Sequence, residues 1–231
     1  MKKFLLIATV FIGSMPLQAQ DVAALIEKVK LKIESVRDYE ATGIMKTNVP
    51  FLKVPVADVK VYYKRPDKLK IKNEKGISLV PKGAVSMSLN NLMANKNFTA
   101  IPAGADRING RQVKIIKLLP LDDQSEIVLS TLYIDEAQLL IMKAVTTTRE
   151  NGTYELAMEY GKFAAYALPQ KAVFTFNTKE YKLPKGVTFD YDDGTDKKKE
   201  DAAVKSNKGM VEITYTNYII NKGVQDAVFK N

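Results

Sequence analysis

The chain has 231 residues, a formal net charge of +9 at pH 7, and neither cysteine nor histidine. The missing cysteines exclude disulfides, thiol chemistry and a lipid-modified cysteine, and the missing histidines remove the usual general base of hydrolases. Without either residue type, zinc sites of the common kinds are excluded as well. These absences favour a binding protein over an enzyme, and we expect neither a cofactor nor a metal.

The first twenty residues, MKKFLLIATVFIGSMPLQAQ, have the pattern of a secretory signal peptide. Lys2 and Lys3 precede the apolar stretch Phe4–Ile12, which is too short to span a membrane, and Ala19 is a small residue at a plausible cleavage position. We therefore expect residues 1–19 to be removed. The mature protein is then a soluble periplasmic protein, and it is not lipid-anchored because it has no cysteine.

Residues 21–38, DVAALIEKVKLKIESVRD, carry the one strong helical pattern of the chain. Apolar side chains recur at intervals of three and four, with lysine and glutamate on the opposite side. The apolar positions are Val22, Leu25, Ile26, Val29, Ile33 and Val36. Asp21 is a suitable N-cap. The pattern predicts an amphipathic helix with one apolar face.

From residue 39 onward the apolar side chains alternate, which predicts β-strands. The candidate strands are 39–47, 57–63, 68–73, 77–80, 112–118, 127–134, 139–149, 153–163, 172–177 and 211–219. Asn109-Gly110 and Asn151-Gly152 are the strongest hairpin signals between them. Residues 98–103 indicate a loop or a brief strand, and residues 86–96 a short second helix.

Many short antiparallel strands with few helices predict a mainly β fold in one domain, residues 20–231. We expect about ten strands in a large, strongly curved antiparallel sheet or a barrel. One face of such a sheet must be covered, and the helix at 21–38, together with 86–96, is the candidate cover. Periodicity does not decide whether the interior is filled or hollow.

Residues 182–209 interrupt two strand patterns with a polar, charged sequence, which predicts an inserted surface loop with a mobile centre at 192–208. The DYDDGTD stretch within it resembles a calcium loop only superficially. Gly194 stands at the fifth position rather than the sixth, and Asp201 replaces the glutamate at the twelfth. A solvated loop is therefore favoured over a calcium site.

The basic residues are expected to be spread over turns and strand faces rather than gathered in one patch. The sequence has no aromatic and basic platform of the kind that binds single-stranded nucleic acid, so no nucleic-acid partner is expected. The positive charge then forms a solvated basic surface, and attraction to anionic lipid headgroups is the alternative.

The order of elements and two motifs resemble the periplasmic lipoprotein carriers of the Lol pathway, the LolA family. The helix ends at an aromatic residue, Tyr39, and an aromatic-rich strand then closes with Tyr63 and Lys-Arg-Pro at 64–66, followed by the polar Asp67. Residues 215–229 resemble the family's last-but-one strands and the loop between them.

The resemblance implies that the curved sheet is an incomplete, half-open β-barrel of about 10–11 strands, whose apolar interior carries the acyl chains of outer-membrane lipoproteins from the inner to the outer membrane. It also implies a helical lid over that interior, and no chemical reaction on the carrier. The implied partners are an inner-membrane ABC-type release complex and an outer-membrane acceptor, and the carrier itself is expected to be a monomer.

In the family, the arginine of this motif hydrogen-bonds backbone carbonyls of the lid, so the resemblance implies that Arg65 closes the lid here. A solvated turn residue is the alternative. The candidate cavity or lid-lining residues are Leu25, Ile26, Val29, Ile33, Tyr63, Met45 and Met93, for which packing in an ordinary core is the alternative.

The chain departs from the family pattern in lacking tryptophan and an Asp-Gly-x-x-x-Trp stretch, and in carrying the 182–209 insertion. Two further functions of the same fold therefore stay open. One is a lipid-sensing or envelope-regulatory binding protein, and the other is a carrier of a different lipid-linked cargo.

Overall fold

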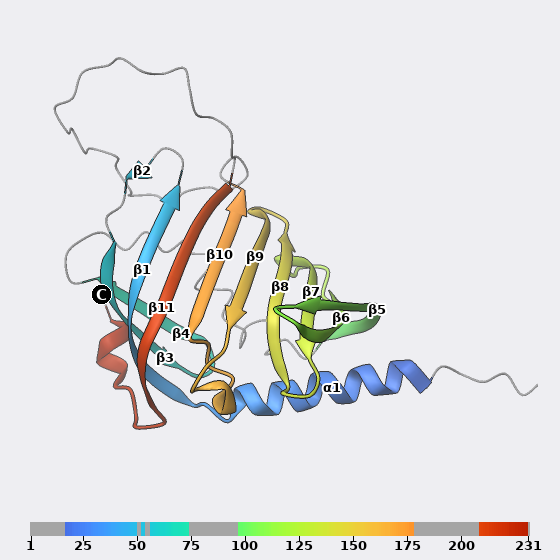
Figure 1. Ribbon diagram of the computed structural model, residues 1–231. Helices are drawn as coiled ribbons and strands as arrows, with labels where there is room; N and C mark the ends of the chain where they lie inside the picture. Colours follow the sequence, from blue (N-terminus) through green and yellow to red (C-terminus); the bar gives the residue numbers. More distant parts are fainter. Residues whose placement is uncertain (1–16, 50–51, 54–55, 74–96, 178–207, 231) are drawn as a thin grey trace, which may run out of the picture.

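The computed structural model describes residues 17–49, 52–53, 56–73, 97–177 and 208–230 (Figure 1). The predicted strand at 77–80, the predicted helix at 86–96 and Met93 lie outside these ranges. So does nearly all of the predicted loop at 182–209. Its last two residues, Lys208 and Gly209, were expected in the loop but begin a strand.

Within the described ranges the chain forms one α-helix, eleven strands and two short 3-10 helices. They are α1 (Leu17–Glu34), β1 (Asp38–Val49), β2 (Leu52–Lys53), β3 (Ala57–Lys64), β4 (Lys68–Asn73), β5 (Phe98–Ile108), β6 (Arg111–Pro120), β7 (Ile127–Asp135), β8 (Leu140–Thr148), β9 (Gly152–Glu159), η1 (Ala164–Tyr166), β10 (Lys171–Asn177), β11 (Lys208–Ile220) and η2 (Asp226–Phe229).

The strands join one antiparallel sheet in the order β4-β3-β1-β11-β10-β9-β8-β7-β6-β5, with β2 paired to β1. Most neighbours follow each other in the chain, but β1 pairs with β11 and so brings the two ends of the domain together. In the described residues no pairing joins β4 to β5, so the sheet is curved but not closed (Figure 1). The predicted half-open, mainly β architecture is confirmed.

The edge strand β5 is much longer than the loop or brief strand predicted at 98–103. Pro102 has no N–H to donate, and Gly104 has a φ of +102°. The pairing with β6 shifts between Pro102 and Ala105, so Gly104 lies in a bulge at the edge of the sheet and Pro102 is the last paired residue before it. A strand therefore continues through a sequence that resembles a turn.

Helix α1 begins at Leu17 and ends at Glu34, earlier at both ends than the predicted 21–38. Asp21 consequently lies inside the helix and is not its N-cap. The helix stops because Asp38 already pairs with Lys64 of β3, so the chain must be extended by that point. Among the described residues, no helix has both the length and the apolar character needed to cross a membrane.

The buried apolar side chains form two clusters. The helix core joins one face of α1 to β6–β9 and contains Val22, Leu25, Ile26, Val29, Ile33, Val113, Ile116, Leu118, Leu132, Ile134, Leu140, Ile141, Met142, Ala144, Met158 and Ala167. The strand core lies over β1, β3 and β9–β11 and contains Val36, Ala41, Met45, Val49, Val59, Val61, Tyr154, Leu168, Phe174, Phe176, Val211, Ile213 and Tyr218. Figure 1 shows α1 running along one end of the sheet towards β7 and β8.

Gly43 lies where β1 and β11 come very close together. The register of the pair shifts between Thr42 and Gly43. A Cβ atom at Gly43 would lie 2.6 Å from the backbone oxygen of Thr214 and 3.2 Å from the Cα of Tyr215. Because these are backbone atoms of a central strand, they cannot rotate away, and only glycine fits.

We expect Gly43→Ala to lower the free energy of unfolding by about 1–3 kcal/mol, because the added methyl group overpacks the β1–β11 contact. Chemical denaturation measures this change. Thr42→Ala is the control, since it removes the exposed Thr42–Thr216 hydroxyl contact without adding an atom to the interface. An equal free energy of unfolding for Gly43→Ala and the wild type would contradict the close approach of β1 and β11 at Gly43.

Candidate functional site

The end of α1, the Lys64–Pro66 turn and the residues after β11 meet at one place, here called the junction. Arg65 contributes most of the contacts from the turn. Its Nη1 donates to the backbone oxygen of Glu34 at 2.9 Å, and its Nη2 lies 3.7 Å from the Glu34 Oε1. Its backbone N–H donates to the oxygen of Arg37 at 2.9 Å. A fixed cation thus caps the carbonyl end of α1, where the helix dipole is negative.

The resemblance implied several lid carbonyls as partners of this arginine. The guanidinium of Arg65 instead contacts one carbonyl and one carboxylate, both of Glu34. Its side chain is 41% exposed, so solvent weakens these contacts. The lid-closing role of Arg65 remains a prediction.

Asn221 holds the junction from the other side, and the sequence reading did not anticipate it. Its Oδ1 accepts the N–H of Arg37 at 2.7 Å, and its Nδ2 donates to the oxygen of Ser35 at 3.0 Å. Its backbone N–H donates to the oxygen of Asp38 at 2.8 Å. Asn221 has a φ of +56°, a conformation that asparagine tolerates better than most residues. The sequence feature that could have indicated this role is the Asn-Lys-Gly stretch at 221–223, which directly follows a predicted strand.

The C-terminal segment after β11 is tied to β3 and β4 by charge. The carboxylate of Asp226 lies 2.8 Å from the Lys68 ammonium and 3.1 Å from that of Lys64. The hydrogen bonds from Lys68 and Lys64 lower the pKa of Asp226 below its ordinary value, so the carboxylate is ionised at neutral pH. Lys70 donates to the backbone oxygen of Lys230 at 2.8 Å.

An aromatic cluster lies beside the junction, on the inner face of the sheet. The Tyr39 ring is centred 5.3 Å from those of both Tyr63 and Tyr218, and the Tyr218 ring lies 5.0 Å from Tyr215 and 4.9 Å from Phe163. Burial raises the pKa of each of these tyrosines, so their hydroxyls stay neutral.

Two of these hydroxyls differ in their hydrogen bonding. The Tyr218 hydroxyl donates to the backbone oxygen of Pro169 at 2.8 Å. The Tyr63 hydroxyl is buried and has no hydrogen-bond partner within the described part of the chain. A buried hydroxyl without a partner is a polar group that a bound molecule could satisfy.

The predicted lining residues fall into two groups. Leu25, Ile26, Val29 and Ile33 lie in the helix core, Met45 lies in the strand core, and Tyr63 belongs to the aromatic cluster through its contact with Tyr39. All six are buried, with exposed fractions of 0–6%. In this structure α1 therefore covers part of the inner face and its apolar side chains contact the sheet. That these residues line a lipid cavity remains a prediction.

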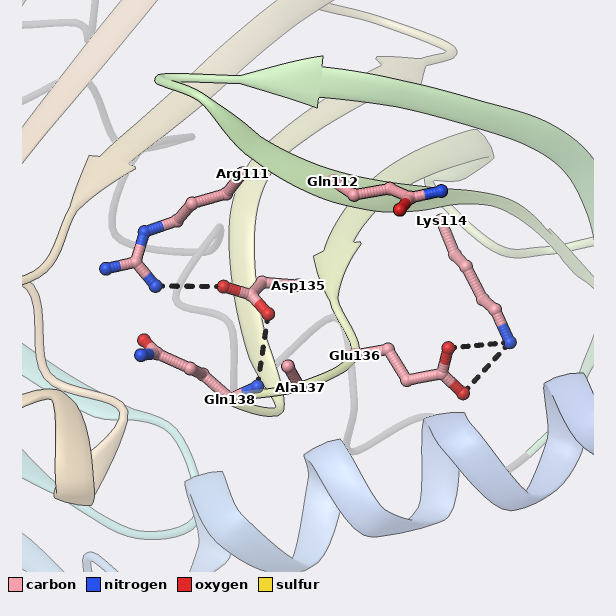
Figure 2. A pocket seen from close by; sticks show the side chains of 7 residues that line it. All are labelled: Arg111, Gln112, Lys114, Asp135, Glu136, Ala137 and Gln138. Carbon is pink, nitrogen blue, oxygen red and sulfur yellow. Dashed lines mark hydrogen bonds and ion pairs between the residues drawn. The ribbon is translucent and has the colours of Figure 1, made fainter.

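A pocket of about 570 Å³ lies where β6 begins, next to the β7–β8 turn (Figure 2). All the residues that line it are charged or polar except Ala137. The Nη1 of Arg111 lies 3.0 Å from the Oδ2 of the buried Asp135, whose Oδ1 accepts the N–H of Gln138 at 3.1 Å. Lys32 of α1 donates to the backbone oxygen of Gln138 at 2.7 Å. The Lys32 contact attaches α1 to the β7–β8 turn, and the charged groups of the pocket do not suit an acyl chain.

No protein-family model and no curated protein matches the sequence. Solved structures do match. A domain provisionally assigned to outer membrane lipoprotein sorting, from Vibrio parahaemolyticus, is 12% identical with a TM-score of 0.54, covering 91% of this chain and 97% of its own. A DUF1329 family protein from Desulfovibrio piger is 11% identical with a TM-score of 0.55, covering 92% and 97%.

A LolA superfamily protein from Nitrosomonas europaea is 10% identical with a TM-score of 0.55, covering 91% of this chain and 97% of its own. Identities this low establish a common fold and nothing finer. Each match nevertheless spans nearly all of both chains. The protein therefore has the LolA-like fold that the helix and the Lys-Arg-Pro motif indicated.

We expect Tyr63→Phe to raise the free energy of unfolding of the ligand-free protein by about 1 kcal/mol, because it removes a buried hydroxyl that has no partner. Tyr218→Phe is the matched control. It should lower the same quantity by about 1 kcal/mol, because the Pro169 oxygen loses its donor. Denaturant titration of both variants provides the test, and a loss of stability in Tyr63→Phe would contradict an unpaired hydroxyl.

Proposed function

We propose that the protein is a periplasmic lipid carrier that encloses acyl chains against the inner face of its sheet and shuttles outer-membrane lipoproteins from the inner to the outer membrane. The observation that carries this proposal is the attachment of α1. Its apolar face completes the helix core, while within the described part of the chain its polar attachments lie in the last turn of the helix and just beyond it.

The apolar contacts of α1 can be exchanged for lipid at little net cost. Burial of the five α1 side chains in the helix core stabilises the closed arrangement by about 10 kcal/mol, at about 2 kcal/mol each. An acyl chain of about twelve methylenes gains about 10 kcal/mol on leaving water, at about 0.8 kcal/mol each. Because the two terms are similar, weak polar contacts can decide which arrangement is populated.

Those weak contacts are the ones that Arg65, Asn221 and Lys32 make with the end of α1 and its surroundings. A hydrogen bond to a charged group contributes about 1–3 kcal/mol, and solvent exposure reduces that value. Each contact is therefore strong enough to bias a two-state cover and weak enough to break when lipid enters.

The cellular setting of the proposal comes from the signal-peptide pattern and the shared fold. Residues 1–19 would direct export to the periplasm, and the chain has no cysteine that could carry a lipid anchor. The partners in this proposal are an inner-membrane ABC-type release complex and an outer-membrane acceptor. The carrier itself performs no reaction, in keeping with a chain without histidine or cysteine.

The purified protein, without residues 1–19, should bind an apolar dye whose fluorescence rises on leaving water, and a diacylated lipopeptide should displace the dye. Fluorescence titration measures both steps, with the same lipopeptide after removal of its acyl chains as the control. Two outcomes would count against an acyl-chain site: the protein does not bind the dye, or only the peptide without acyl chains displaces the dye.

We expect Arg65→Leu to bind the same dye about five-fold more tightly, because a bond worth about 1 kcal/mol is lost only from the closed arrangement. Release of bound lipopeptide to acceptor vesicles should slow correspondingly. Arg37→Leu is the matched control, since its guanidinium makes no hydrogen bond or ion pair with any described residue. If both variants behave alike, Arg65 has no part in closing the cover.

A further inference from the structure

Five lysines gather on the outer face of β3 and β4, contrary to the expectation that basic residues are spread over the surface. On the opposite face Val59, Val61 and Tyr63 are buried and Leu69 and Ile71 pack against the strand core. Side chains alternate along a strand, so the intervening residues must point outward. We call them the lysine face, which consists of Lys60, Lys64, Lys68, Lys70 and Lys72 around Tyr62.

The pairing of β3 with β4 places like charges directly opposite each other. Lys60 faces Lys72, Lys64 faces Lys68, and Tyr62 faces Lys70. Opposed like charges destabilise an antiparallel pair unless a carboxylate bridges them. Asp226 bridges Lys64 and Lys68, whereas no carboxylate of the described residues bridges Lys60 and Lys72. A sheet edge could remain soluble with a mixture of charges, which suggests that the lysines are there to bind something negative.

Within the described ranges, carboxylates neutralise only part of this charge. Lys64 and Lys68 share the carboxylate of Asp226. Lys70 donates to a neutral carbonyl, and the Lys72 ammonium lies 5.5 Å from the centre of the Tyr62 ring. Among the described residues, no carboxylate lies within ion-pair distance of Lys60, Lys70 or Lys72.

Among the described residues, the acidic side chains near the lysine face other than Asp226 lie around its margin. Glu40 is opposite Tyr62 on the next strand, Asp58 lies at the start of β3, and Asp67 lies in the turn. The centre of the face is therefore positive. It is also built on a pleated sheet surface rather than in a concavity, so it suits an extended partner better than a small ligand.

We propose that the lysine face docks the protein on the anionic headgroups of a membrane. Lysine presents a compact, hydrated charge on a long stem, which suits many phosphates spread over a plane, whereas arginine suits one phosphate in a fixed geometry. Tyr62 adds an amphipathic side chain of the kind found at headgroup level. The inference rests on the proposed carrier function, because it names the surface by which a carrier meets its membrane.

The lysine face lies on the side of the sheet away from the two cores. Docking through it would keep the inner face, where α1 packs, away from the membrane. The Asp226 carboxylate neutralises Lys64 and Lys68, which also belong to the contacts of the C-terminal segment, whereas Lys70 donates only to the neutral oxygen of Lys230. The charge available to a membrane would therefore lie chiefly on Lys60, Lys70 and Lys72.

The test is co-sedimentation of the protein without residues 1–19 with vesicles of phosphatidylglycerol and phosphatidylcholine, and with vesicles of phosphatidylcholine alone. We expect binding to the anionic vesicles only, falling steeply as salt rises. A variant with Lys60→Gln, Lys70→Gln and Lys72→Gln should bind about 10- to 100-fold more weakly, since each basic residue near such a surface contributes about five-fold.

The matched control carries Lys28→Gln, Lys30→Gln and Lys117→Gln, which removes the same net charge from α1 and β6 and should bind as the wild type does. Equal weakening of both variants, no binding by the wild type, or preference for an acidic protein over the vesicles would overturn the proposal. Dye uptake separates this result from the carrier function. The lysine-face variant should still take up the dye. If the carrier proposal is wrong, the wild type will not take up the dye either.

Discussion

The burial of one apolar helix face against an open sheet is the interaction on which the rest of the structure depends. A sheet whose end strands do not pair with each other cannot enclose its own inner face, so another element must cover it. Helix α1 supplies part of that cover with side chains such as Val29, which is fully buried. The contact is non-directional, so in the proposed carrier a lipid chain would replace it without leaving polar groups unpaired.

The directional contacts are concentrated where α1 ends. Arg65 and Asn221 reach the same short stretch from opposite ends of the chain, because β1 pairs with both β3 and β11. This placement gives the cover one fixed end and leaves its remaining length held by apolar contacts. Asp38 continues the arrangement into the C-terminal segment by accepting the N–H of Gly223 at 2.8 Å.

Strands β3 and β4 give the two faces of the sheet different roles. Val61 and Ile71 pair across the strands on the inner side, where they contribute to the strand core, and Lys60 and Lys72 pair on the outer side. The same alternation thus produces an apolar surface inside and a basic surface outside. In the proposed carrier, one side would hold the acyl chain and the other would contact the membrane.

Several features followed from the sequence because they depend on neighbouring residues. The spacing from Val22 to Ile33 predicted an amphipathic helix, and the Asn109-Gly110 turn, with φ values of +50° and +77°, joins β5 and β6 as a two-residue turn should. The prediction of a loop or a brief strand at 98–103 was too short because Pro102 and Gly104 are uncommon in strands. A bulge in an edge strand such as β5 tolerates these residues, whereas a central strand would not.

The sequence by itself determined the alternation of the strands, the apolar face of the helix and the Lys-Arg-Pro turn, since each is encoded within a few residues. Only the tertiary structure decided that Arg65 meets Glu34, that Asn221 meets Ser35, and that the lysines of β3 stand opposite those of β4. These contacts depend on strand register and on pairing between distant segments. Such pairing is set by the summed burial of the whole sheet, which no short stretch of residues records.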